Sequence, residues 1–351
     1  MAGRRASRIA ALLAACGTAA AALWAGAASA QEGRTSPTVE TIKKRGELVC
    51  GVDTGIPGFA YQDNAGKWQG FDVTYCRAIA AAVLGDAEKV RYLPLTTKVR
   101  FTVLQSGEID VLIRDSTLTF SRDTQLGLAE VATTFYAGQN FMVRKSLGVD
   151  SLKGMDGATI CMLTGATLEL NLADYNKRNG VNVGSLLFDK ADEAFAAAEA
   201  GRCDGYSDDS GSVAAARSAM KNPDDWVFLP ELISKEPLGI HAREGDERWF
   251  DILRWTHYAL LTAEELGVTK ANIDEMKATS NDPFVRRLLG VEGDFGKLLG
   301  LDNDWSYRAL KVGGNYAEIY AATFGEKGLG LPRGLNKLHS DGGLQYPLPF
   351  R

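Results

Sequence analysis

Histidine and the familiar motifs of enzymes are scarce in this chain. Its 351 residues include three histidines, His241, His257 and His339, which lie far apart in the sequence. No His-Glu-x-x-His pair, Cys-x-x-Cys pair, Gly-x-Ser-x-Gly turn or phosphate-binding loop is present. Because such patterns supply metal ligands, nucleophiles and phosphate contacts, the sequence predicts no metal site and no cofactor.

Long apolar runs are missing after residue 30, whereas a membrane-spanning helix needs about 20 apolar residues. Residues 9–28 form one Ala- and Leu-rich run, which follows three arginines and ends at Ala28-Ser29-Ala30. A charged start, an apolar middle and a small-residue cleavage site are typical of a secretory signal. We therefore expect residues 1–30 to be a signal peptide and the mature chain to be a water-soluble, exported protein.

A second processing site overlaps this run. Leu13-Ala14-Ala15-Cys16 resembles a bacterial lipobox, which would place a lipid on Cys16. The apolar stretch before it is short, and the Ala-Ser-Ala site fits the longer run better. Lipoprotein anchoring at Cys16 is therefore the minor alternative.

Positive charge is in deficit. Without the three arginines of the signal, 36 basic residues remain against 44 acidic ones, a net charge of −8. Proteins that bind nucleic acid carry basic patches that neutralise phosphates. The composition therefore argues against a nucleic-acid partner.

Cysteine is sparse but even in number after the signal: Cys50, Cys76, Cys161 and Cys203. In an exported chain this count predicts two disulfides. Four cysteines allow three pairings, and counting does not choose among them. Free buried thiols are the alternative.

Short apolar runs alternate with helical stretches in two successive segments. Each segment offers three expected strands: residues 47–52, 90–95 and 109–113 in the first, and 158–163, 185–188 and 203–207 in the second. Helices are expected at 72–85, with Asp72 as N-cap and Gly85 as C-terminal stop, and at 99–106, 167–178 and 191–200. This alternation predicts an α/β fold with a mainly parallel sheet.

The two segments share details that predict two related lobes. In each, a strand with a central cysteine, Cys50 or Cys161, leads into a Thr-Gly turn. In each, a later strand ends in a polar cluster, Asp115-Ser116-Thr117 or Asp208-Asp209-Ser210. Since ligands of open α/β sheets bind beyond the carboxyl ends of the strands, both clusters are expected in one cleft. The matching positions also favour Cys50–Cys76 and Cys161–Cys203, one bridge within each lobe.

We expect one lobe at residues 38–138 plus 241–351 and the other at 139–240. The stretches 134–143 and 234–242 are extended and are expected to cross between the lobes as a two-strand hinge. A long amphipathic helix at 248–266 opens the C-terminal tail, whose Gly- and Pro-rich end, 325–351, is expected to wrap the surface of a lobe.

Two charged residues of the clusters could hold a free amino acid. Burying its carboxylate and ammonium requires charged partners, and the planar fork of arginine engages both oxygens of a carboxylate. Arg122 and Asp209 follow the strands of the two segments. The structural alternatives are a surface ion pair of Arg122 with Asp123, and Asp209 as the N-cap of a helix at 212–220.

The sequence also resembles the periplasmic solute-binding proteins of polar amino-acid ABC importers, and most of all their general L-amino-acid-binding branch. The similarity covers nearly the whole mature chain. It is carried by stretches in both segments and in the tail, namely residues 48–52, 70–73, 76–78, 104–111, 121–123, 157–161, 169–175, 201–204, 234–239, 286–290 and 313–316. The resemblance implies a type II two-lobe fold with a ligand cleft between the lobes, an L-amino-acid ligand, a periplasmic location of the Gram-negative type, an inner-membrane ABC permease as partner, and a monomer.

By this resemblance, Arg122 clamps the ligand carboxylate, helped by the Thr117 hydroxyl and the Thr119 N–H. Thr167 adds a contact from the second lobe, and Asp209 holds the ammonium. Asp53 falls where relatives specific for cationic amino acids place an acid that reaches the ligand side chain.

Three residues depart from those narrow relatives. Ile56 replaces a ligand-stacking aromatic residue, and Arg114 and Asp115 replace small hydroxyl residues. Arg114 and Asp115 could pair with each other or meet charged ligand side chains. These departures favour a broad specificity.

The main rival is an exported enzyme on the same architecture, a dehydratase acting on an amino-acid precursor. Such chemistry needs a positioned acid or base. Glu108, Glu169 and Asp208 are candidates, but the sequence gives none of them a partner. A sensor module is the other rival, and neither a membrane-spanning nor a kinase-like segment follows the lobes. We therefore expect a binding protein, not an enzyme.

Overall fold

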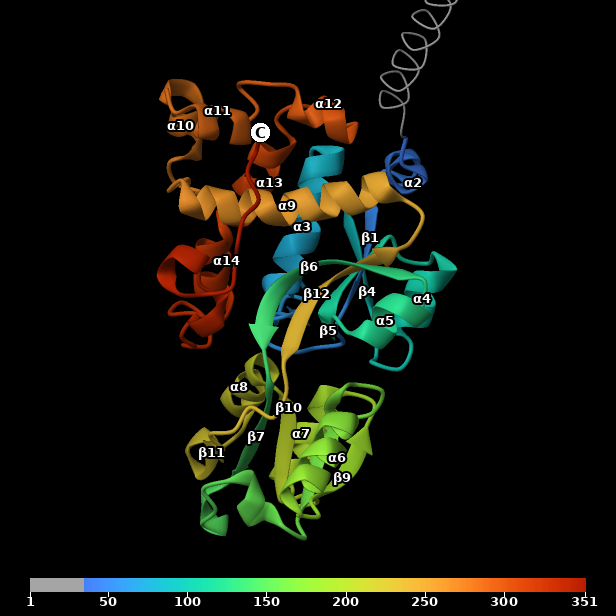
Figure 1. Cartoon of the computed structure of the whole chain (residues 1–351), viewed down its shortest axis with the longest axis vertical. Helices are drawn as coiled ribbons and strands as arrows, with labels where there is room; N and C mark the ends of the chain where they lie inside the picture. The colour runs from blue at the N-terminus through green and yellow to red at the C-terminus, as the bar shows by residue number, and fades with distance from the viewer. Residues whose placement is uncertain (1–34) are drawn as a thin grey trace, which may run out of the picture.

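The computed structural model describes residues 35–351, which fold into two bodies, each built on a five-stranded sheet (Figure 1). The expected signal peptide and Cys16 lie outside the described residues. Within the described part, no helix is both long and apolar enough to cross a membrane.

The upper body in Figure 1 contains a sheet with strand order β4-β1-β5-β12-β6. Neighbours β4, β1 and β5 are parallel, whereas β12 is antiparallel to β5 and β6. Strand β1 is buried along its whole length, which explains its unbroken apolar sequence, since strands covered on both faces lose polar alternation. The strands are β1 Leu48–Val52, β4 Val90–Pro94, β5 Val111–Thr117, β6 Leu128–Ala137 and β12 Glu236–Arg243.

The lower body repeats this arrangement with the order β9-β8-β10-β7-β11. Again three parallel strands, β9, β8 and β10, are followed by two antiparallel neighbours. The strands are β7 Gln139–Arg144, β8 Thr159–Leu163, β9 Gly184–Phe188, β10 Gly205–Asp209 and β11 Trp226–Phe228, and the helices are α6 Leu168–Asn179, α7 Ala191–Glu199 and α8 Ser210–Ala219. The two-lobe α/β architecture expected from the repeated pattern is confirmed.

Two extended connections join the bodies. The chain leaves the upper sheet at the end of β6 and enters the lower one at β7, with Gly138 between them; it returns at the start of β12. Glu236 of β12 pairs with Ala137 of β6, so the two connections lie side by side where they cross. This pair of strands forms the hinge between the bodies.

Each body contains one disulfide, as expected. Cys50 of β1 is bonded to Cys76 of the helix α3 Phe71–Leu84, and Cys161 of β8 is bonded to Cys203, just before β10. Each bridge ties a strand that neighbours β5 or β10 to another part of the same body. They leave the hinge free, because neither joins the two bodies.

The C-terminal third adds helices to the upper body alone. The long helix α9 and the helix α13 pack against α3. The additional helices of this body are α2 Pro37–Arg45, α4 Arg100–Ser106, α5 Phe120–Gln125, α9 Glu247–Glu265, α10 Ile273–Thr279, α11 Pro283–Leu288, α12 Phe295–Leu299, α13 Trp305–Gly313 and α14 Tyr316–Thr323; a short hairpin is formed by β2 Tyr61–Gln62 and β3 Trp68–Gln69.

The end of the chain braces one side of the hinge. Asn336 forms hydrogen bonds with both the N–H and the carbonyl of Tyr136 in the edge strand β6, at 2.7 and 3.0 Å. Gln345 and Tyr316 donate to the carbonyl of Thr134 in the same strand. The tail thus satisfies backbone groups that an exposed sheet edge leaves unpaired.

Three local expectations differ from the structure. Asp72 is not the N-cap of α3; Gly70 holds that position, and the Asp72 side chain is buried and accepts a hydrogen bond from the Asp115 N–H. Strands β5 and β10 begin two residues later than expected and extend through the polar residues. The polar residues at their ends point into a buried space between the bodies. They therefore continue the strands and do not begin a loop.

Removing the lower-body disulfide should destabilise the protein. A bridge across 42 residues restricts the unfolded chain, which typically contributes about 2–4 kcal/mol. The double variant Cys161→Ser/Cys203→Ser should therefore lose about that much free energy of unfolding, measured by urea denaturation against the oxidised wild type. An unchanged midpoint would contradict a structural role for this bridge.

Candidate functional site

The polar ends of β5 and β10 meet in a small cavity between the two bodies. Its volume is about 20 Å³, which is room for about one or two water molecules. Residues of both bodies line it: Thr97, Arg100, Arg114, Asp115, Thr117, Arg122, Leu163, Ala166, Thr167, Leu168, Asp208, Asp209, Glu236 and Leu238. The described protein is therefore in a closed arrangement.

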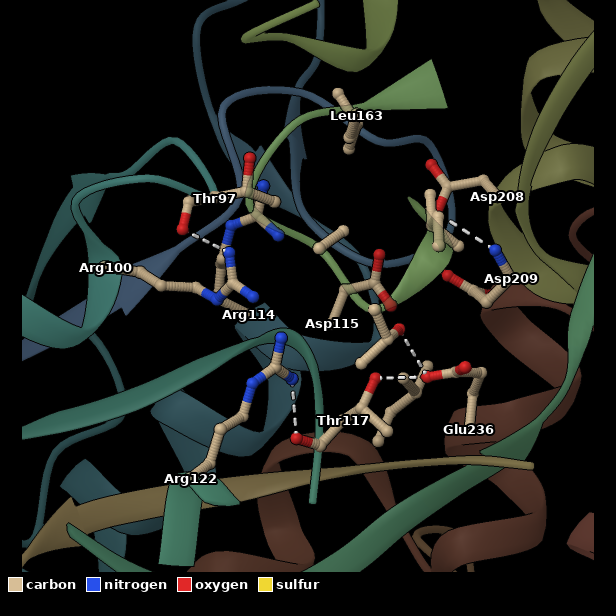
Figure 2. Close-up of a pocket in the computed structure, with 14 residues that line it drawn as sticks. Thr97, Arg100, Arg114, Asp115, Thr117, Arg122, Leu163, Asp208, Asp209 and Glu236 are labelled. Carbon is tan, nitrogen blue, oxygen red and sulfur yellow. Dashed lines mark hydrogen bonds between the residues drawn. The ribbon is translucent and has the colours of Figure 1, made fainter. Parts of the chain in front are cut away.

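Charge is distributed unevenly around this cavity. In Figure 2 the guanidinium groups of Arg100, Arg114 and Arg122 gather on one side, and the carboxyl groups of Asp208, Asp209 and Glu236 lie on the other. All three arginines belong to the upper body, whereas Asp208 and Asp209 belong to the lower one. Closure thus brings a basic surface and an acidic surface face to face.

Arg122 reaches the cavity from the short helix α5. Its Nη1 donates to the backbone carbonyl of Thr117 at 2.7 Å, and its guanidinium lies 4.9 Å from the ring centre of Phe101. Burial lowers the pKa of Arg122 to about 10, opposed by the nearby carboxylates Glu236 and Glu130. The side chain thus remains charged at neutral pH and is held in place by a carbonyl and an aromatic ring.

Arg100 was missed by the sequence analysis. It starts α4, directly after the loop that follows β4, and its side chain is 2% exposed. Its Nη1 donates to the Thr97 carbonyl and its guanidinium packs over the same Phe101 ring as Arg122, while Nε has no hydrogen-bond partner among residues 35–351. Burial, together with Arg114 and Arg122, shifts the pKa of Arg100 well below its usual value. Its position just after the end of a strand was the one feature of the sequence that could have indicated a place in the site.

Arg114 pairs with Asp53, not with Asp115. The Arg114 guanidinium forms a fully buried ion pair with the Asp53 carboxylate and donates from Nε to the Leu95 carbonyl at 3.0 Å. Asp53 is 0% exposed and does not line the described cavity. The carboxylate that was expected to reach a ligand side chain is thus paired with Arg114, and its contact with a ligand stays a prediction.

Asp209 lies at the end of β10 and combines two expected roles. Its Oδ1 accepts hydrogen bonds from the N–H groups of Gly211 and Ser212, so it is the N-cap of α8. It is also buried on the cavity wall, 4% exposed. The capping role and the position in the cleft are compatible, since capping uses one oxygen and leaves Oδ2 directed to Ser212 Oγ at 2.9 Å.

Asp115 brings a carboxylate from the upper body to the same place. Its Oδ2 accepts from Ser212 Oγ of the lower body at 3.1 Å, and its Oδ1 is buried without a hydrogen-bond partner in the described chain. Its φ of 42° lies in the left-handed region, which costs a residue with a side chain about 1–2 kcal/mol. Asp115 is thus held against a conformational preference where strain often marks function.

Three carboxyl groups crowd together as a result. Oxygens of Asp115, Asp208 and Asp209 lie within 4.8 Å of one another. Burial, and then repulsion from Asp209, raises the pKa of Asp208 to about 8, and burial also raises the pKa values of Asp115 and Asp209. Arg114 lowers the pKa of Asp115 only in part, and Arg114 is itself paired with Asp53.

Of the three threonines expected at the site, Thr117 and Thr167 lie in the cavity wall and Thr119 does not. The hydroxyls of Thr117 and Thr167 donate to Glu236, at 2.5 and 2.9 Å, and line the cavity. The Thr119 N–H donates to Glu130 Oε1 at 2.6 Å and its hydroxyl caps α5, so Thr119 lies outside the described cavity. Glu236 itself was missed as a site residue; its position at the crossing between bodies was the available signal.

The side of the cavity away from the hinge is closed by two contacts between the bodies. Thr97 Oγ1 donates to the Thr164 carbonyl at 2.8 Å, and Lys98 Nζ lies 2.6 Å from Asp189 Oδ1. The ion pair is half-exposed and therefore weak. These contacts can open without a large loss of free energy.

A family model described as bacterial extracellular solute-binding proteins, family 3, matches residues 48–286. The chain belongs to this family. The expected type II two-lobe fold follows from that membership and from the observed sheets.

Similar proteins extend the likeness over the C-terminal helices as well. The chain is 52% identical to the glutamate/glutamine/aspartate/asparagine-binding protein BztA of Rhodobacter capsulatus, over 94% of this chain and 96% of that protein. It is 50% identical to the general L-amino acid-binding periplasmic protein AapJ of Rhizobium johnstonii, over 97% and 98%. A solved ABC transporter periplasmic binding protein from Brucella ovis, with glutathione bound, is 49% identical and superposes with a TM-score of 0.88 over 90% of this chain and all of that one.

The crowded carboxyl groups make the stability of this solute-binding protein depend on pH. The pKa of Asp208 rises from 3.8 to about 8 in the folded protein, so the folded state binds more protons than the unfolded state between these values. The contribution of Asp208 to the free energy of unfolding should therefore fall as pH rises from about 4 to 8. The buried His241 and His257, whose pKa values fall to about 3, act in the opposite direction below about pH 6.5. Asp208→Asn should make this dependence shallower and raise the melting temperature at pH 8 by a few degrees.

Melting curves at pH 5, 6.5 and 8 check this, with Asp174→Asn as the control because Asp174 is an exposed aspartate of α6. Equal pH slopes for wild type and Asp208→Asn would contradict the assignment.

Proposed function

We propose that this protein binds free L-amino acids in the periplasm, with broad specificity, and delivers them to the permease of an ABC importer. The observation that carries the proposal is the separation of opposite charges across one buried cavity, with Arg122 on one wall and Asp209 on the other. The names of the similar proteins, which include amino-acid-binding and general L-amino-acid-binding proteins, support the same ligand class. The protein acts as an exported monomer.

The two charged groups of the ligand have complementary partners in the cavity. The carboxylate lies against Arg122, whose planar group can donate to both oxygens. The ammonium lies against Asp209, at the cluster of buried carboxyl groups. Buried ions without partners are costly, so the ligand lowers the free energy of the closed form more than that of the open form.

This difference explains how binding closes the cleft. A cavity of about 20 Å³ does not admit an amino acid, so the bodies must separate before the ligand enters. The moving parts are residues 38–138 with 241–351, and residues 139–240, turning about the paired strands next to Gly138 and Glu236. Ligand then shifts the equilibrium toward the closed form, which the permease recognises.

Arg100 adds a preference for ligands with acceptor oxygens in the side chain. Its buried Nε lacks a partner in the described chain, and a ligand carboxylate or amide oxygen can accept from it. The similar protein named for glutamate, glutamine, aspartate and asparagine supports this choice of side chains. Arg114 does not compete for this role, because Asp53 already neutralises it.

Chemical conversion of the ligand finds no support in the site. Glu108 and Glu169 lie outside the described cavity, and Asp208 accepts hydrogen bonds from the Tyr206 hydroxyl at 2.7 Å and the Asp209 N–H at 2.9 Å. The similar proteins are binding proteins. Mass spectrometry of amino acids recovered after incubation with the protein should therefore show them unchanged.

A thermal-shift screen of the twenty common L-amino acids tests the proposal, because a ligand that binds only the folded protein raises its melting temperature. Arg122→Ala and Asp209→Asn should each weaken binding of every ligand found by at least about a hundredfold, since each leaves a buried ligand charge unpaired. Calorimetric titration measures the loss. Arg91→Ala, which removes an exposed arginine far from the cavity, is the control and should bind normally. Near-normal affinity in Arg122→Ala would overturn the carboxylate assignment.

The proposed role of Arg100 predicts a change in ligand ranking. Arg100→Gln should weaken binding of L-glutamate at least tenfold more than binding of L-alanine, because alanine has no side-chain acceptor. Both ligands are titrated into the same protein preparation by calorimetry. Partial misfolding then lowers the binding heats of L-glutamate and L-alanine together and leaves the ratio of their affinities unchanged. Equal losses for the two ligands would contradict a side-chain contact.

A further inference from the structure

The cavity contains one carboxylate that is already fully occupied by hydrogen-bond donors. Glu236, the first residue of β12, is 2% exposed and accepts four hydrogen bonds. Its Oε1 accepts from Asn171 Nδ2 at 2.7 Å and from Ser234 Oγ at 2.6 Å, and its Oε2 accepts from Thr117 Oγ1 at 2.5 Å and from Thr167 Oγ1 at 2.9 Å. A carboxylate has about four such acceptor positions, so Glu236 has none left for a ligand.

These contacts join both bodies at one point. Thr117 ends β5 of the upper body, Thr167 and Asn171 belong to the start of α6 in the lower body, and Glu236 lies where the chain returns across the hinge. Figure 2 shows the Glu236 carboxylate directed at Thr117, on the acidic side of the cavity. The set can be complete only when the bodies are closed.

The bonds to Glu236 decide what the two hydroxyls offer a ligand. A threonine hydroxyl has one hydrogen and two lone pairs, and an ionised carboxylate is only an acceptor. Thr117 and Thr167 therefore donate their single hydrogens to Glu236 and turn lone pairs toward the rest of the cavity. In this state neither hydroxyl donates to a ligand carboxylate; both accept from a ligand ammonium.

We propose that Glu236 is a positioning residue that fixes Thr117 and Thr167 as acceptors for the ligand ammonium. An ammonium group has three N–H donors, so Asp209 and two threonine hydroxyls, one from each body, satisfy it together. Glu236 thereby makes recognition of the ammonium depend on closure of the cleft. The inference rests on the proposed function, because it concerns how the same site reads an amino acid.

The test is a double-mutant cycle on the intact protein with L-alanine, L-glutamine and L-glutamate as probes. Glu236→Gln keeps the shape but replaces one acceptor oxygen by an NH2 donor, which disrupts the arrangement in which four donors converge on one carboxylate. We expect affinity for the probes to fall at least tenfold. Thr117→Val should cause a similar loss, whereas Thr117→Ser should bind within about threefold of wild type. The double variant Glu236→Gln/Thr117→Val should have the same affinity as Thr117→Val, to within about threefold.

Glu231→Gln is the matched control, because Glu231 accepts from the Leu152 N–H in the lower body and does not line the described cavity. It should bind like wild type. Melting temperatures of the unliganded variants separate misfolding from altered recognition. If Glu236→Gln does not fold, Asn171→Ala takes its place in the cycle with Thr117→Val. Asn171→Ala removes one donor that orients Glu236, so it should weaken binding at least threefold. In the double variant with Thr117→Val, it should cause no further loss of affinity.

Two outcomes contradict this inference while leaving the proposed function intact. One is that Glu236→Gln binds the probes within twofold of wild type. The other is that the double variant loses affinity by the product of the two single losses, which would make the two residues independent. A wild-type protein that binds none of the three probes would instead remove the proposed function itself, and this inference with it.

Discussion

Burying opposite charges on facing walls of one cavity is the constraint on which the rest of this structure depends. A guanidinium or carboxylate removed from water is stable only when a partner replaces the water. Here the arginines of the upper body have carbonyls, an aromatic ring or Asp53 as partners, while the aspartates at the end of β10 and at Asp115 have mostly N–H groups and hydroxyls. In the closed form without ligand, burial therefore raises the pKa values of these aspartates, and in the proposed function a ligand ammonium stabilises their ionised form.

In the proposed function, the fold converts the pairing of ligand charges into motion of whole lobes. The two sheets share one strand pattern, three parallel strands followed by two antiparallel neighbours, so their polar strand ends point toward the same space. Each disulfide stiffens one lobe, and the C-terminal tail braces β6 through Asn336 and Gln345. Rigidity is thus placed within the lobes, and the paired connections near Gly138 are left to bend.

Much of the fold could be predicted because it depends on local patterns. The alternating apolar runs predicted the main strands and helices of both lobes, and the matching cysteines favoured the disulfides within each lobe. Arg122, Asp209 and Asp115 could be located at the cavity because they follow strands whose carboxyl ends meet in such sheets.

The remaining site residues depend on the directions of side chains across long sequence separations. Asp53, which was expected to reach a ligand side chain, forms a buried ion pair with Arg114, 61 positions along the chain, and no local pattern predicts this pair. Asp72 was taken for a helix cap, whereas it is a buried acceptor for the Asp115 N–H. Glu236 accepts from the hydroxyls of Thr117 and Thr167, and Thr167 approaches it from the other lobe. Arg100 carries no pattern beyond its position after a strand. Contacts of this kind come from three-dimensional assembly.

A crystal structure with a bound L-amino acid would test the central claim most directly. The account predicts the ligand carboxylate within hydrogen-bonding distance of the Arg122 guanidinium and the ligand ammonium within hydrogen-bonding distance of Asp209, with both lobes in contact with the ligand. A ligand whose carboxylate and ammonium touch neither of these residues would contradict it.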